Sequence, residues 1–197
     1  MNIVRSIIKE AINEAFLGEM AVDFMHVGPN IGLVKEVSGK EAQLILFDFV
    51  TKQCVGLISI KKTSPRQYTV VNAASEKGYG PLVYEIAMMD VYPMGLTPDR
   101  NGHITPKAFD VWKVFHDSRR DITKKQIVPG DVEYSDRYIY DNESQPIVLN
   151  CLYYRTPSLF YQKLLGKGEE FSKKHNISSQ EILNISNEFF KNKYSSR

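Results

Sequence analysis

Residues 68–88 read YTVVNAASEKGYGPLVYEIAM, and this stretch decides the fold. The β-branched run around Val70 predicts a strand, and Gly78 and Gly80 predict a tight turn after it. Pro81 marks the start of a helix, because the first helical position tolerates the missing N–H of proline. A strand that passes through a glycine turn into a helix directs backbone N–H groups and the positive end of the helix dipole at one point, which suits a phosphate. The same kind of turn also occurs as a purely structural connection.

The region before the turn predicts an antiparallel sheet. Runs rich in valine, isoleucine, leucine, phenylalanine and tyrosine predict strands at residues 31–37, 42–50, 54–61 and 67–72. Short polar turns separate these runs, and connections of a few residues join antiparallel neighbours. The expected arrangement is a meander whose last strand leads into the glycine turn.

A short strand and a capped helix are predicted after the helix that follows the turn. Residues 94–97 have the character of a strand. Thr105 can cap the next helix, and Pro106 fits its first position. The apolar stripe of this helix comprises Ala108, Val111, Trp112 and Phe115.

The C-terminal part predicts one more strand and two helices. A polar, highly charged stretch covers residues 117–145, and residues 146–154 then have the pattern of a strand. The Thr-Pro pair at 156–157 repeats the cap-and-proline signature before a short helix. Ser178 and Glu181 form a capping box, in which each side chain satisfies a backbone N–H at the start of the last helix.

The N-terminal residues 2–17 predict an amphipathic helix, with an isoleucine-rich stripe opposite charged side chains. Such a helix either packs on the core of its own protein or docks onto a protein partner. The sequence leaves both interpretations open.

The bulk composition favours a single domain over residues 1–197. The 25 basic and 23 acidic residues leave a formal net charge of +2, which does not favour nucleic acid or a membrane surface as a partner. No apolar run is long enough to span a bilayer. Cys54 and Cys151 are the only cysteines, and neither they nor the four histidines show metal-ligand spacing. We therefore expect no metal site and a cytoplasmic location.

The order of these elements resembles that of the GCN5-related N-acetyltransferase (GNAT) superfamily. The cofactor turn of that family follows the pattern Arg/Gln-x-x-Gly-x-Gly/Ala, and residues 75–80 here read Ser-Glu-Lys-Gly-Tyr-Gly. The resemblance implies a GNAT-like α/β fold, an α+β mixed sheet with a meander and C-terminal helices. It places the cofactor-binding core at residues 30–117 and the C-terminal strand and helices at 146–197. It also implies acetyl-CoA, or another acyl-CoA, as the cofactor.

The resemblance assigns two groups of residues to this cofactor. In the family, the strand before the turn hydrogen-bonds the pantetheine arm, and the turn holds the pyrophosphate. The pantetheine residues would be Val70, Val71 and Asn72, and the phosphate residues would be Lys77, Gly78, Tyr79, Gly80, Pro81 and Leu82. The glycines let the backbone approach an anion closely, and the lysine adds a positive charge.

The catalytic pattern of the family is altered in this chain. Many members carry Asn-x-x-Ala-x-x-x-Tyr on the helix after the fifth strand, where the tyrosine protonates the departing CoA thiolate. Alignment on Ala108 puts Trp112 at the tyrosine position, and an indole cannot act as a general acid near neutral pH. Asp99 and His103 are the candidates for the base that deprotonates the acceptor amine. His116, one helical turn beyond the tryptophan, is the candidate for the acid.

Each of these side chains also has a structural interpretation. The histidines fit surface or structural positions, and Asp99 can anchor a turn or pair with Arg100. Glu85, on the helix after the glycine turn, is expected to be solvated.

The sequence thus predicts an acyl-CoA-dependent N-acyltransferase that acts on an amine of a small molecule or a protein. The alternative is a non-catalytic protein of the same fold, in which residues 2–17 dock onto a partner. In its short chain and leading helix it is similar to small bacteriophage-encoded GNAT-like proteins, which would place it in a host cytoplasm. A nucleotide- or nucleic-acid-binding module that uses the same turn is a third and weaker interpretation.

Overall fold

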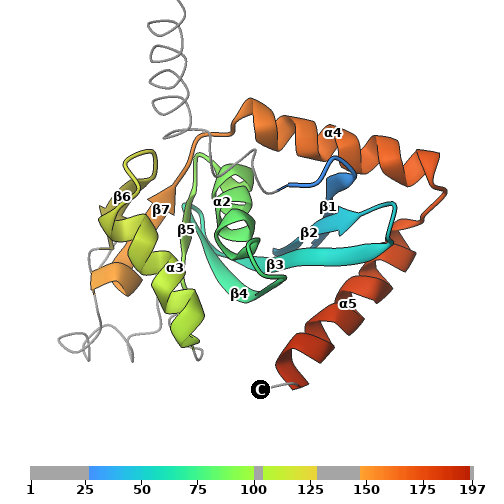
Figure 1. Ribbon diagram of the computed structural model, residues 1–197. Helices are drawn as coiled ribbons and strands as arrows, with labels where there is room; N and C mark the ends of the chain where they lie inside the picture. The colour runs from blue at the N-terminus through green and yellow to red at the C-terminus, as the bar shows by residue number, and fades with distance from the viewer. Residues whose placement is uncertain (1–26, 100–103, 128–146, 196–197) are drawn as a thin grey trace, which may run out of the picture.

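The structure, a computed structural model, describes residues 27–99, 104–127 and 147–195 (Figure 1). Within these ranges seven strands form one mixed sheet in the order β1-β2-β3-β4-β5-β7-β6. The strands are β1 (Ile31–Ser38), β2 (Glu41–Asp48), β3 (Gln53–Ser64), β4 (Gln67–Ser75), β5 (Gly95–Thr97), β6 (Thr123–Gln126) and β7 (Cys151–Tyr154). The helices are α2 (Gly80–Val91), α3 (Pro106–Asp117), the 3-10 helix η1 (Ile147–Asn150), α4 (Leu159–Lys174) and α5 (Ser179–Ser195). The predicted α+β class is confirmed.

The predicted meander is confirmed, and its turns have a clear backbone cause. Strands β1 to β4 are antiparallel neighbours in chain order. Gly39 and Lys52 adopt positive φ values of 60° and 54° in two of the connecting turns. The chain then crosses over through α2, so that β5 lies parallel to β4.

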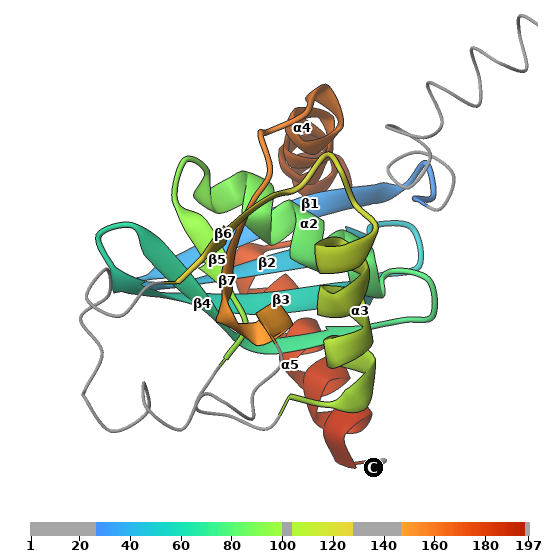
Figure 2. The ribbon, with the colours of Figure 1, turned by 90° about the vertical axis from the view of Figure 1, so that its left-hand side faces the viewer.

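Helices cover both faces of the sheet. Figure 2 shows α2 and α4 above the sheet and α5 below it. The alternation of side chains along β2 fits this sandwich, because Leu44 and Leu46 join the core under α2, whereas Ile45 and Phe47 pack against α5. A strand with helices on both faces buries both sets of side chains, and this explains the unbroken apolar run in β2.

The N-terminal strand and α4 cross at two glycines. A Cβ atom added to Gly168 of α4 would lie 2.0 Å from the carbonyl oxygen of Leu33, and one added to Gly32 would lie 2.6 Å from the Gly168 nitrogen. The two backbones are therefore in direct contact, and no side chain fits between them. This contact fixes how closely α4 approaches the sheet.

Helix caps were predicted correctly at two of three sites. The Thr105 hydroxyl accepts the Ala108 N–H at 3.2 Å, and the Ser178 hydroxyl accepts the Glu181 N–H at 3.2 Å. This confirms the Ser178 half of the predicted capping box, whereas the Glu181 carboxylate lies 3.5 Å from the Lys52 ammonium. The predicted start of the next-to-last helix at Thr156–Pro157 is wrong, because Ser158 caps α4 by accepting the Tyr161 N–H at 3.3 Å.

The predicted strand at residues 146–154 is correct only in its last four residues. Residues 147–150 form η1 instead, and the Tyr153 hydroxyl of β7 donates to the Val148 carbonyl at 2.6 Å. A short buried apolar run does not distinguish a strand from a helical turn.

Strand β6 lies in the polar stretch at 117–145, where no strand was predicted. It occupies the edge of the sheet, where charged residues are common. The predicted helix at 2–17 lies outside the described residues.

Candidate functional site

Strand β4 separates from its neighbour β5 partway along its length. The two strands pair only at Gln67–Thr69 and Gly95–Thr97, and β4 continues to Ser75. Its register with β3 also shifts, because Ser59 lies opposite Asn72 while Ile60 lies opposite Val70. Val71 is therefore the extra residue of a β-bulge, a feature that bends a strand and ends pairing. In the part of the chain that the structure describes, no strand pairs with this edge of β4 beyond Thr69.

A cleft of about 270 Å³ opens where the two strands separate. Strand β4 forms one wall and α3 the other. The residues that line it are Val70, Val71, Asn72, Ala73, Tyr84, Asp99, Ile104, Thr105, Ala108, Trp112 and Tyr194. The cleft thus brings together all three predicted pantetheine residues and the predicted base Asp99. It also contains Ala108 and Trp112, the two α3 positions aligned with the alanine and tyrosine of the family pattern.

The glycine turn directly follows the end of β4. Gly78 has a φ of +95°, which an L side chain rarely adopts, and the Tyr79 N–H closes the turn on the Glu76 carbonyl at 3.1 Å. A Cβ atom at Gly80 would meet only the Ser75 hydroxyl oxygen at 3.6 Å, so only Gly78 requires glycine for its conformation.

Helix α2 begins without a side-chain cap. Tyr79 stands at the N-cap without a side-chain cap hydrogen bond, and Pro81 has no N–H to satisfy. The N–H groups of Gly80 and Leu82 lie among the first in the helix, which have no acceptor within it. These donors and Lys77 are available to an anion at the end of β4.

Trp112 is a core residue as well as a wall of the cleft. It is only 2% exposed, and its ring centroid lies 5.1 Å from that of Tyr84 and 4.8 Å from that of Tyr153. Tyr84 therefore places a phenol next to the position where the family pattern has its acid. Tyr84 was not predicted as a site residue, although it lies one turn after Gly80 on the same helix.

The last turn of α5 closes the cleft on one side. The Tyr194 hydroxyl donates to the Ala73 carbonyl at 3.3 Å, and the Lys193 ammonium lies 2.9 Å from the Glu76 carboxylate. These residues are more than a hundred positions apart in the sequence, and no local pattern could have predicted their contact.

The predicted catalytic residues do not all lie together. Asp99 lines the cleft, and His103 lies outside the described residues. His116 is not among the residues that line the cleft. Its Nδ1 lies 2.9 Å from the Asp117 carboxylate in the last turn of α3. Among the described candidates, only Asp99 is thus placed to face a bound substrate.

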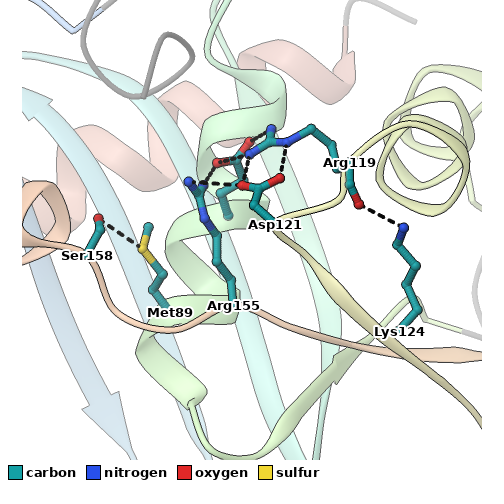
Figure 3. Close-up of polar contacts among 7 residues, drawn as sticks. Met89, Arg119, Asp121, Lys124, Arg155 and Ser158 are labelled. Carbon is teal, nitrogen blue, oxygen red and sulfur yellow. Dashed lines mark hydrogen bonds and ion pairs between the residues drawn. The ribbon is translucent and has the colours of Figure 1, made fainter. Parts of the chain in front are cut away.

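The expectation that Glu85 is solvated is wrong. Helix α2 is apolar on every side, so Glu85 is fully buried, and two arginines neutralise it. Arg119 donates from Nη1 at 2.5 Å and from Nη2 at 3.3 Å, and Arg155 pairs with the second carboxylate oxygen. Figure 3 shows both guanidinium groups converging on Asp121 as well. Arg119 lies 2.6 Å and Arg155 3.4 Å from that carboxylate.

Burial raises the pKa of four weak acids among the described residues, Cys54, Tyr84, Tyr153 and Tyr161, and this predicts a loss of stability in alkali. It raises the pKa of the Cys54 thiol from 9.0 to about 11 and that of Tyr84 from 10.0 to about 12. The unfolded chain therefore ionises first, and the stability that is present at neutral pH falls as the pH rises through the range from 9 to 12. Urea unfolding at increasing pH should show this decline, and Tyr84→Phe should make it shallower. An unchanged slope in that variant would contradict the raised pKa of Tyr84.

No family model, curated protein or solved structure matches the chain. The helices of the described segments also lack the combination of length and apolar character that a membrane crossing requires. No cluster of three or more metal-ligating side chains occurs among the same residues. Function is therefore inferred from the cleft, the turn and their chemistry.

Proposed function

We propose that the protein is an N-acyltransferase that uses acetyl-CoA or another acyl-CoA as acyl donor. The observation that carries the proposal is the separation of β4 from β5 beside a cleft, with the glycine turn at the end of the same strand. The open edge of β4 can bind the amide-containing pantetheine arm of the cofactor. The start of α2, at the end of the same strand, can bind the phosphates. The resemblance to the GNAT superfamily points to the same ligand.

The open edge of β4 can pair with the amides of pantetheine. The Ala73 carbonyl points toward this edge, because the Tyr194 hydroxyl donates to it. In an extended strand the N–H of a residue lies on the same side as its carbonyl, so the Ala73 N–H also faces the cleft. Val71, the extra residue of the bulge, is 40% exposed and gives the cleft an apolar surface. The phosphates would then lie against Lys77 and the start of α2.

The reaction needs a base and a way to stabilise the leaving thiolate. The neutral amine attacks the thioester carbonyl, the C–N bond forms, and the C–S bond breaks as the thiolate leaves. Asp99 is the candidate to take the proton that the amine loses. Tyr84 has a pKa of about 12, so it stays protonated and donates a hydrogen bond rather than its proton. A thiol has a pKa of about 8.5, so its thiolate leaves readily and can be protonated by water.

One observation favours a second function, a GNAT-like protein that binds without catalysis. Trp112 is buried in an aromatic cluster at the position where the family has its acid. In this alternative, which matches the similarity to bacteriophage-encoded proteins, residues 2–17 dock onto a protein partner and the cleft only holds the ligand. Turnover separates the two functions, because only the enzyme releases the free CoA thiol.

Isothermal titration with acetyl-CoA tests the binding of the cofactor, which both proposed functions require. We expect saturable binding to the wild type and none to Ala108→Phe, because Ala108 lines the cleft and a phenyl ring there would fill it. Val114→Phe is the matched control, since Val114 is 50% exposed on the same helix and is not among the residues that line the cleft. Absence of binding to the wild type at millimolar acetyl-CoA would exclude both functions. Equal binding to Ala108→Phe would place the ligand elsewhere.

A further inference from the structure

We infer that the last turn of α5 is an autoinhibitory strap, which has to leave β4 before an acyl-CoA can bind along that strand. The inference rests on the proposed function and concerns the regulation of the same site. The strap consists of Lys193 and Tyr194. Tyr194 contacts Ala73 in the cleft, and Lys193 contacts Glu76 in the glycine turn. Neighbouring residues of one helix thus close both the pantetheine part and the phosphate part of the proposed cofactor site.

Tyr194 occupies a hydrogen-bond acceptor that pantetheine would use. Its hydroxyl donates to the Ala73 carbonyl at 3.3 Å, on the open edge of β4. A carbonyl oxygen can accept a second hydrogen bond, but the phenol ring that reaches this one is itself a wall of the cleft. An amide that pairs with Ala73 in the geometry of a neighbouring strand needs the space that the ring takes. Cofactor and strap therefore compete for the same edge.

The strap is held by weaker contacts than the body of α5. Helix α5 packs on the face of the sheet opposite α2 (Figure 2), and its residues Ile182 and Ser186 are fully buried. Tyr194, in contrast, is 41% exposed, and both partners of the ion pair between Lys193 and Glu76 are partly exposed. Ion pairs of this kind contribute little, because water competes with them. The last turn can therefore unwind while the rest of the helix stays on the sheet.

The ring of Tyr194 has a contact that does not involve its hydroxyl. Its centroid lies 4.2 Å from that of Phe190, one turn earlier on α5, and Phe190 packs against the core on that face of the sheet. Phenylalanine at position 194 would keep this contact and lose only the hydrogen bond to Ala73. Tyr194→Phe therefore tests the strap without removing the aromatic side chain.

Calorimetric titration of the full chain with acetyl-CoA measures the competition. We expect Tyr194→Phe to bind about fivefold more tightly than the wild type, the factor that corresponds to one neutral hydrogen bond in the closed state. Tyr92→Phe is the matched control, since Tyr92 is 45% exposed and is not among the residues that line the cleft. This control should bind like the wild type.

An uncharged ligand tests the ion pair of the strap. S-Acetylpantetheine lacks the phosphates of the cofactor, so the charge of Lys193 cannot attract it. Lys193→Gln should bind this ligand about twofold more tightly, the small effect expected from an exposed ion pair. Lys191→Gln, an exposed lysine two positions earlier, is the control and should leave the affinity unchanged. Weaker binding in Lys193→Gln would contradict the inference, because Lys193 would then support the ligand.

Hydrogen exchange of the wild type distinguishes a strap from a fixed wall. Saturating acetyl-CoA should accelerate exchange of the amides at residues 191–195, because the last turn opens when the ligand enters. A fixed wall would instead gain protection. Slower exchange there, or equal affinities of the wild type and Tyr194→Phe, would overturn the inference and leave the proposed function intact. Absence of binding to both proteins at millimolar acetyl-CoA would overturn the two together.

Discussion

Replacement of Glu85 with glutamine is expected to lower the free energy of unfolding by about 3–5 kcal/mol, the cost of removing one partner from a buried ion pair. The side chain is fully buried, and Arg119 and Arg155 are 16% and 8% exposed. Glutamine keeps the shape but removes the charge, so both guanidinium groups lose the carboxylate that each of them pairs with in the interior. Urea denaturation followed by circular dichroism measures the change.

An exposed carboxylate provides the control for this variant. Asp117 pairs with Lys113 and His116 at the surface of α3, where water and ions screen the interaction. Asp117→Asn should therefore leave the urea midpoint almost unchanged. A similar loss of stability in both variants would mean that the burial of Glu85 does not determine its contribution to the free energy of unfolding.

Replacement of Gly168 with alanine is expected to destabilise the protein by about 3 kcal/mol, at the upper end of the usual cost of overpacking. The new Cβ would lie 2.0 Å from the Leu33 carbonyl oxygen, a backbone atom of β1, which pairs with β2 along its whole length and therefore cannot shift alone. Helix α4 would have to move away from β1, which would loosen the apolar contacts between them. Thermal and urea unfolding of the purified variant measure the loss.

The same helix supplies the matched control. A Cβ atom at Gly166 would meet no atom within 4 Å, and this residue is exposed. Gly166→Ala should therefore stabilise the protein by up to about 1 kcal/mol, because alanine favours a helix more than glycine does. Both variants replace glycine with alanine. A loss of stability at residue 168 and a gain at residue 166 would therefore attribute the difference to the contact between α4 and β1. Equal effects would show that helix propensity alone governs both positions.

The sheet was largely predictable because most of its strands and turns are determined by residues that lie close together in the sequence. Runs rich in β-branched, aromatic and leucine residues, separated by short turns, predicted β1 to β4, and the caps at Thr105 and Ser178 need only residues three positions away. Strand β6 was not predictable in this way, since its TKKQ sequence has no apolar pattern and forms a strand only by pairing with β7. Its register depends on a partner more than twenty residues further along the chain.

The candidate site was predictable along β4 and α3 but not where α5 closes it. Val70, Val71 and Asn72 line the cleft as expected, because they belong to the strand that leads into the turn. Tyr194 was not predicted, since its place in the cleft follows from how α5 packs on the far side of β3. The burial of Glu85 had a usable signal, because α2 has apolar residues on every face and its charged residues therefore need partners.

The contact between Tyr194 and Ala73 has a consequence for synthesis on the ribosome. Strands β1 to β4 can pair as soon as they leave the exit tunnel, because the meander involves only neighbours in the chain. The wall that Tyr194 provides joins them 121 positions later. The edge of β4 in a nascent chain thus lacks this wall while the residues between Ala73 and Tyr194 are translated. The cleft is therefore among the last parts of the molecule to be completed.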